Sequence, residues 1–130
     1  MFSHVHLGSD DVPRAKLFYD AIMATLGGVE SWKDQTRDRW FWRRDGAFLI
    51  VGTPLDEEAA QPGNGVTIGF AVDSPEQGDA WHAAGLAAGG TSVEGAPGIR
   101  EQGGARRYLA YLRDPDGNKL CAFRMMGPGE

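Results

Sequence analysis

Three residues with side chains suited to catalysis or metal binding lie in short apolar segments. His4 and His6 alternate with Val5 and Leu7, so in a strand the two imidazoles share one face. Cys121 is the only cysteine and lies near the C-terminus. A neutral imidazole is a suitable base near pH 7, and two imidazoles with one thiolate suit zinc. We therefore treat His4 and His6 as candidate catalytic residues and Cys121 as a candidate metal ligand or nucleophile.

Each of these patterns also has a structural explanation, which the sequence leaves open. Two histidines at alternate positions also arise when a strand lines a polar cleft. A free cysteine in a strand is commonly buried and inert, and a nucleophilic role needs a nearby histidine or cation that lowers its pKa.

The elements that position these residues occur twice in the chain. Segments 4–28 and 67–90 each run from an alternating strand through Asp and Pro into an amphipathic helix that ends at a Gly pair. This repeat predicts two similar modules related by a pseudo-twofold axis, with any site where they meet. The matching residues are Asp11 and Asp73, Pro13 and Pro75, Tyr19 and Trp81, and the Gly pairs at 27–28 and 89–90.

Each module is predicted to contain a strand, a helix and three further strands. The helices are expected at 14–26 and 76–88, and the further strands at 29–34, 38–44, 47–53, 91–95, 106–113 and 118–125. We expect a single domain over 1–130, with modules at about 1–54 and 66–126 joined by a polar linker at about 55–65. The Gly-rich loop 95–105 is a candidate lid or an uninvolved surface loop, and His82 is expected on the surface of the second helix or in a dimer contact.

Strand parity separates core residues from residues of the expected cleft. If Asp45-Gly46 is a two-residue turn, Trp40 opposes Val51 and Trp42 opposes Leu49, which places both tryptophans in the core. The alternate residues then face the cleft: Arg39, Phe41 and Arg43.

Arginines cluster in both halves and offer paired hydrogen bonds to a carboxylate or phosphate. Arg43 is the preferred anion contact because its parity matches that of Phe48 and Ile50, and Tyr108 is a candidate for the opposite wall. The alternative is that the arginines are solvated and balance the 18 acidic residues. The clusters are Arg37, Arg39, Arg43 and Arg44, and Arg100, Arg106, Arg107 and Arg113.

Two stretches resemble a known superfamily. HVHLGSDDVPRAKLFYDAIMATLGG, from His4 to Gly28, is similar to the opening strand and helix of the vicinal oxygen chelate superfamily, which contains glyoxalase I, bleomycin-resistance proteins and extradiol dioxygenases. YLAYLRDPDGNKLCAF, from Tyr108 to Phe123, is similar to its closing hairpin, in which DPDG makes the turn. The resemblance implies an α+β fold in which two tandem βαβββ modules form a curved mixed sheet around a central cleft.

The resemblance also implies four cleft positions for a divalent metal, and this sequence departs from the usual ligands. Carried onto this chain, the positions are His4, Ile50, Thr67 and Cys121. Only His4 is a standard ligand and both expected carboxylates are absent, so we expect a degenerate metal site. A site rebuilt from His4, His6 and Cys121 for zinc, nickel, iron or manganese is the alternative.

Two functional classes follow from the resemblance. The first is a binding protein that holds a small organic or anionic molecule in the cleft, as bleomycin-resistance proteins do. The alternative is a divergent glyoxalase-like lyase, isomerase or dioxygenase that uses a rebuilt metal site or histidine acid–base chemistry. The family also suggests a homodimer. The candidate ligand-binding residues are Arg43, Phe48, Ile50, Thr67, Tyr108 and Cys121.

Composition excludes other classes of function. The net charge of −5 argues against general nucleic-acid binding. No apolar run approaches the roughly 20 residues that a membrane-spanning helix needs. A single cysteine and the lack of a recognisable export signal at the start of the sequence favour a cytoplasmic location.

Overall fold

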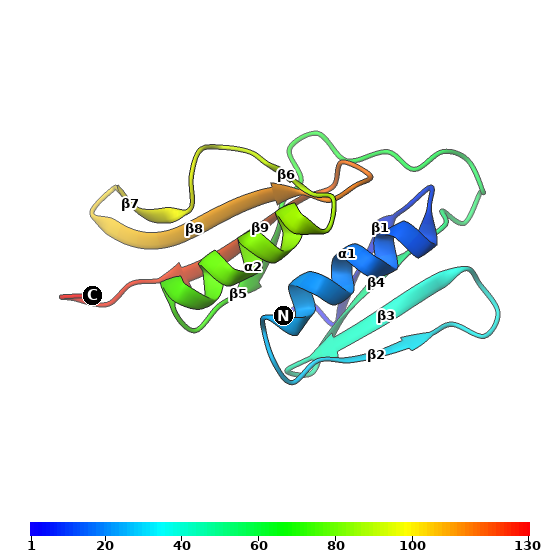
Figure 1. Ribbon diagram of the computed structural model, residues 1–130, viewed down its shortest axis with the longest axis horizontal. Coiled ribbons are helices and arrows are strands. Elements are labelled where there is room, and N and C mark those ends of the chain that lie inside the picture. The colour runs from blue at the N-terminus through cyan, green and yellow to red at the C-terminus, as the bar shows by residue number, and fades with distance from the viewer.

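The computed structural model describes residues 1–130 as two modules, each built around one helix (Figure 1). The first module contains β1 (His4–Gly8), α1 (Val12–Ala24), β2 (Glu30–Lys33), β3 (Arg39–Arg44) and β4 (Ala47–Gly52). The second contains β5 (Ile68–Ala71), α2 (Pro75–Ala87), β6 (Thr91–Ser92), β7 (Gly98–Gln102), β8 (Ala105–Arg113) and β9 (Lys119–Met125).

Both helices begin at a capping side chain followed by proline. The Asp11 carboxylate accepts a hydrogen bond from the backbone N–H of Arg14 at 3.0 Å, and Pro13 lies in the first turn of α1. Ser74 caps α2 in the same way, directly before Pro75. The helices therefore begin two residues and one residue earlier, respectively, than the sequence pattern predicts.

The strands form one sheet in each module, and the strand order leaves β1 and β5 at sheet edges. Sheet A has the order β1-β4-β3-β2, and sheet B has the order β5-β9-β8-β6, with β7 also paired to β8. β1 runs parallel to β4, and β5 runs parallel to β9, whereas the hairpins are antiparallel. The α+β fold with two tandem modules is confirmed.

The predicted register of the β3–β4 hairpin is confirmed. Trp40 pairs with Val51 and Trp42 pairs with Leu49. The turn between the strands has positive φ at both central residues, 52° at Asp45 and 81° at Gly46. That geometry matches a tight two-residue turn, which fixes the register.

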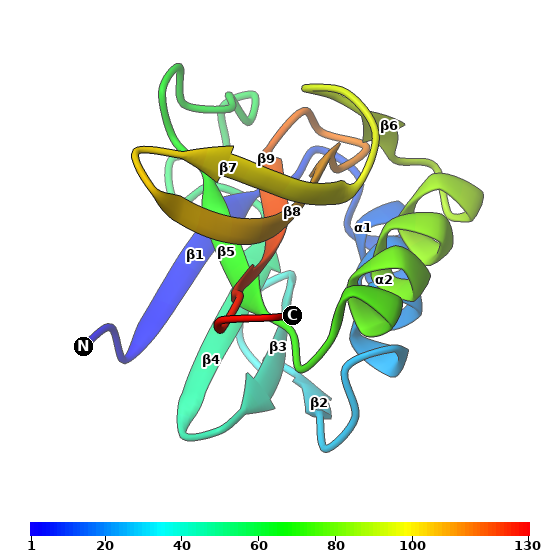
Figure 2. The same ribbon diagram turned by 90° about the vertical axis from the view of Figure 1, so that its left-hand side faces the viewer.

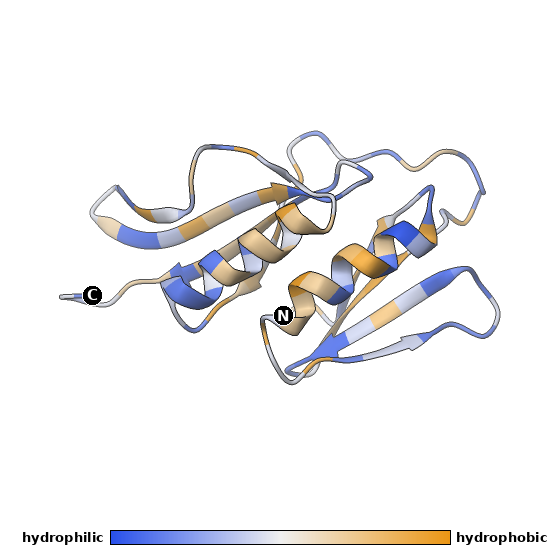
Figure 3. Ribbon diagram, viewed as in Figure 1, coloured by the Kyte–Doolittle hydropathy of each residue, from blue (hydrophilic) through white to orange (hydrophobic).

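The helices lie on the same side of the molecule and pack against each other and against the sheets (Figures 1 and 2). Tyr19 of α1 and Trp81 of α2, which match in the sequence repeat, are both fully buried in one core that draws on both modules. Figure 3 shows stronger apolar colour on α1 than on α2. No helix is long and apolar enough to cross a membrane.

Two expectations about the second module are wrong. The candidate lid is in fact mainly a strand, since β7 occupies residues 98–102 and pairs with β8. The expected strand at 91–95 is reduced to Thr91–Ser92. Glu94 and Gly95 both have positive φ, which ends the extended conformation there.

Candidate functional site

The face of sheet A opposite α1 carries both candidate catalytic histidines. His4 lies beside Phe48 on the neighbouring strand, and His6 lies beside Ile50. Phe41 pairs with Ile50 from the other side. The predicted parity is therefore confirmed for this face, because the alternate residues of β1 and β4 point into the core.

A row of aromatic rings crosses all four strands on this face. The rings of His4 and Phe48 are stacked, with centroids 4.9 Å apart and planes within 7°. Phe48 contacts Phe41 at 5.9 Å, and Phe41 stacks on Trp32 at 5.2 Å with planes within 9°. Cross-strand aromatic pairs of this kind stabilise a sheet.

Two arginines cover the far end of this aromatic row, and both are already paired. The Arg43 guanidinium lies over the Trp32 ring and makes an ion pair with Glu30 at 2.7 Å. Arg39 lies over Phe41 and bonds Asp34 at 2.7 Å. Arg43, the predicted anion contact, is therefore neutralised in this structure by a carboxylate of its own sheet.

The corresponding face of sheet B places Cys121 between Gly69 and Tyr111. Cys121 is 7% exposed, and burial raises the pKa of its thiol above the ordinary value, although Lys119 opposes the shift. A thiol in this environment stays protonated at neutral pH, so it lacks the activation that a nucleophile or metal-ligating thiolate needs.

A cavity of about 570 Å³ lies between the edges of the two sheets. His4 and Phe48 line it from sheet A, whereas Thr67 and Gly69 line it from the β5 segment. Its walls are mostly apolar, and a volume of this size is within the range of small-molecule sites. The remaining lining residues are Phe2, Val5, Met23, Leu26, Val29, Trp42, Arg44, Asp45, Ala47, Leu49, Ile68, Phe70 and Ala71.

Arg44 joins the two modules at this cavity. Its guanidinium donates a hydrogen bond of 2.8 Å to the backbone carbonyl of Ala71 at the end of β5. From the sequence alone, Arg44 belongs to the first arginine cluster and is not predicted to lie at the site. No sequence signal could have singled it out, because its partner is a backbone oxygen in the other module.

The residues at the family's four metal positions do not fit a divalent ion. Ile50 has no donor atom, Thr67 offers only a hydroxyl, and the thiol of Cys121 is held protonated by burial. His4 instead stacks on Phe48, and its Nδ1 is hydrogen-bonded to the Ser3 hydroxyl at 2.8 Å. Nowhere do three or more His, Cys, Asp or Glu side chains form a group that could hold a metal ion.

His6 is the central residue of β1 and lies beside a polar recess of about 600 Å³. Arg37 lines the same recess from the β2–β3 connection, and the linker adds Asp56 and Glu58. Burial lowers the pKa of His6, and the positive charges of Arg39, Arg37 and His4 lower it further. His6 is therefore neutral at pH 7.

Two further residues lie where the sequence did not predict. Tyr108 is not on the cleft wall: it is 1% exposed on the helix-facing side of β8, and its hydroxyl donates to Asp79 of α2 at 2.7 Å. His82 is not on the surface, because Ser92 of β6 covers that face of α2, with His82 Nε2 and Ser92 Oγ 3.0 Å apart.

Comparison with known families decides the classification. Residues 1–122 match the family model described as the Glyoxalase/Bleomycin resistance protein/Dioxygenase superfamily. The chain belongs to this superfamily. The resemblance noted in the two motifs is thereby confirmed over nearly the whole sequence.

Solved structures of glyoxalase/bleomycin-resistance proteins share this fold. One from Albidiferax ferrireducens T118 is 49% identical, with a TM-score of 0.89 over 95% of this chain and 98% of that one. A glyoxalase/bleomycin resistance protein/dioxygenase family enzyme from Burkholderia phytofirmans PsJN is 19% identical, with a TM-score of 0.72 over 95% and 98%.

A more distant structure is the lactoylglutathione lyase from Agrobacterium tumefaciens. It is 19% identical, with a TM-score of 0.64 over 95% of this chain and 92% of that one. At this identity the likeness concerns the superfamily fold alone. No protein of curated function matches the chain significantly.

Proposed function

We propose that this superfamily member binds a small organic molecule in the cavity between its modules, without the family's metal. The observation that carries the proposal is the mostly apolar cavity of about 570 Å³ beside β1, β4 and β5. Two of the family's metal positions, His4 and Thr67, line this cavity. Buried apolar surface supplies most of the affinity in such a site, and a few polar groups orient the ligand.

Four of the six residues predicted to bind ligand contribute to the proposed site, and Arg43 and Tyr108 do not line it. Phe48 forms the aromatic wall with His4, and the Thr67 hydroxyl offers a hydrogen bond. Ile50 and Cys121 support the two walls from the neighbouring positions of β4 and β9. Arg43 lies over Trp32 at the far end of the aromatic row, outside the cavity, and Tyr108 takes no part because it faces α2.

A thermal-shift screen of small aromatic and aliphatic compounds tests the proposal. A ligand present at 100 times its Kd stabilises the folded state by about 2.7 kcal/mol, which is readily detected. Phe48→Ala should weaken binding of the resulting hits about tenfold or more. Phe123→Ala, a matched change on the open face of sheet B outside the cavity, should leave binding unchanged. Equal effects of the two changes would place the ligand elsewhere.

A second candidate function rests on His6. A neutral imidazole in a solvent-accessible polar recess is a suitable general base, which is consistent with a divergent lyase or isomerase. A turnover assay on hits from the screen, with His6→Gln as the comparison, tests this. Loss of turnover in His6→Gln with ligand affinity retained would favour the enzyme, whereas unchanged turnover would remove His6 from the chemistry.

We also propose a homodimer in the cytoplasm. Large apolar side chains that remain exposed support self-association, notably Phe2, Leu55 and Met125. The single cysteine supports a reducing compartment. Light scattering at micromolar concentration and cell fractionation test the two statements. A monomer in solution would overturn the proposed homodimer. Recovery of the protein outside the cytoplasm would overturn the proposed location.

A further inference from the structure

The aromatic row of sheet A ends at His4, because β1 is the edge strand of that sheet. The row consists of Trp32, Phe41, Phe48 and His4. No strand pairs with β1 on its outer side, and the cavity adjoins His4 there: residues of the β5 segment line it, as do core residues such as Trp42 and Leu49. We propose that the cavity takes a planar aromatic or heteroaromatic ring, which stacks on His4 as the next member of the row. This inference rests on the proposed function and names the ligand class of the same site.

The direction of stacking supports this placement. His4 and Phe48 are direct cross-strand partners, and their parallel rings are stacked across the strands rather than along them. The next position in that direction lies past β1, toward β5. A flat ring there would meet the imidazole face to face in an offset arrangement, which is favourable between π systems. A saturated ring of the same size would gain only the burial of its apolar surface.

The wall formed by the β5 segment alternates small residues, Thr67, Gly69 and Ala71, with the larger Ile68 and Phe70, and the small positions leave room for such a ring. Gly69 lies within β5, where glycine weakens a strand unless something approaches the backbone closely. A Cβ at Gly69 would meet only the Cys121 sulfur, at 3.4 Å, so packing with the rest of the protein does not require glycine there. Its backbone φ is also not positive, so conformation does not require it either. Close approach of a ligand explains a glycine at this position.

Polar groups near the ring position indicate what the ligand carries at its edge. The Ser3 hydroxyl bonds His4 Nδ1 and leaves Nε2 for a ligand, and the Thr67 hydroxyl lines the same cavity. Arg44 is held by the Ala71 carbonyl, and Arg43 is paired with Glu30. The site therefore suits an uncharged ring system with a hydroxyl or a similar polar substituent, rather than a ligand bound chiefly through its charge.

Calorimetric titration with 2-naphthol and with its saturated, non-planar counterpart 2-decalol tests the inference. The wild-type chain should bind 2-naphthol at least tenfold more tightly than 2-decalol. His4→Leu keeps apolar bulk but removes the aromatic face, so it should weaken 2-naphthol about tenfold and leave 2-decalol unchanged. Gly69→Val should weaken both compounds by filling the cavity. Gly98→Val, at a position where a Cβ meets nothing within 4 Å, is the matched glycine control.

The outcomes separate this inference from the proposed function. Equal affinity for the two compounds, or an equal loss of both in His4→Leu, would overturn the aromatic ligand class while leaving an apolar binding cavity. Failure of both compounds and of the wider screen to bind would overturn the cavity as a binding site as well. His4 is exposed, so His4→Leu is expected to fold. The test therefore does not depend on whether Gly69→Val folds.

Discussion

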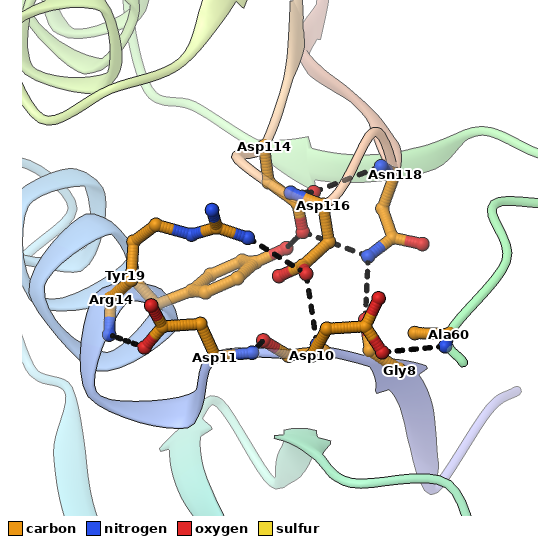
Figure 4. A network of polar contacts seen from close by, with 10 residues as sticks. Gly8, Asp10, Asp11, Arg14, Tyr19, Ala60, Asp114, Asp116 and Asn118 are labelled. Atoms are coloured by element: carbon orange, nitrogen blue, oxygen red, sulfur yellow. Dashed lines mark hydrogen bonds and ion pairs between the residues drawn. The ribbon is translucent and has the colours of Figure 1, made fainter. Parts of the chain in front are cut away.

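Tyr19 donates a hydrogen bond to Asp114 across the junction of the two modules, with 2.6 Å between the phenol oxygen and Asp114 Oδ2 (Figure 4). Tyr19 lies on α1, whereas Asp114 opens the DPDG turn between β8 and β9. Asn118 completes the link, since its amide donates to Asp114 Oδ2 at 2.9 Å and to the carbonyl of Gly8 at 3.1 Å. The DPDG turn, one of the two motifs that resemble the family, therefore also links the second module to the first by hydrogen bonds.

Removal of the Tyr19 hydroxyl should destabilise the whole chain. Burial raises the pKa of Asp114, and the bond from Tyr19 opposes that shift by stabilising the carboxylate. Tyr19→Phe should cost about 1–3 kcal/mol of unfolding free energy, because it leaves a buried carboxylate oxygen with one donor fewer. Urea unfolding measures this. Tyr111→Phe, whose hydroxyl makes no hydrogen bond in the chain, is the control, and equal stability of both variants would contradict the account.

Gly78 of α2 should not tolerate alanine. Alanine in a helix is ordinarily favoured over glycine by about 1 kcal/mol. Here a Cβ would lie 2.0 Å from a ring carbon of Tyr108, which packs against the helix from β8. Gly78→Ala should therefore destabilise by about 1–3 kcal/mol through overpacking. Thermal unfolding of Gly78→Ala, with Gly98→Ala as the control, measures this loss of stability. A Gly78→Ala protein more stable than wild type would refute the packing argument.

Stability should depend on pH through His82. Burial lowers the pKa of this imidazole below its ordinary value of 6.5, against the opposing influences of the Tyr111 backbone and Asp79. Between the folded and unfolded pKa values the unfolded chain binds more protons, so stability falls as pH drops below about 6.5. His82→Gln should flatten this part of the profile. Unfolding by urea at pH 7.5, 6.5 and 5.5 measures the slope, and an unchanged slope would show that His82 does not contribute.

The Cys121 thiol should be unreactive in the folded protein. Its burial and raised pKa leave little thiolate at neutral pH. Iodoacetamide should label it slowly in the native state and rapidly in urea, as followed by mass spectrometry. Fast labelling of Cys121 in the native state would support the hypothesis that it is a nucleophile.

Local rules were enough to predict much of sheet A. The two-residue turn at Asp45-Gly46 leaves a single register, so the partners of Trp40 and Trp42 followed from counting along the hairpin. In sheet B the turn at DPDG is longer, so the sequence alone does not fix the register between β8 and β9. The face of Tyr108 therefore could not be derived, and it turned out to point to α2.

The environments of the site residues depend on contacts between modules, which no local pattern contains. Helix α2 is buried largely through Gly78, Trp81, His82 and Gly85, so its weak apolar pattern did not show that His82 lies inside. The Arg44 bond to Ala71 likewise joins residues of different modules. The sequence predicted which residues share the open strand faces, but not that His4 would stack on Phe48.

The most direct test of the central claim is elemental metal analysis after incubation with nickel, zinc, iron and manganese, using wild type and His4→Ala. If His4 serves as an aromatic wall rather than a metal ligand, neither protein should retain a stoichiometric amount of any of the four metals. One equivalent of metal in the wild type that disappears in His4→Ala would contradict the account, and would show that the chain has rebuilt the family's metal site.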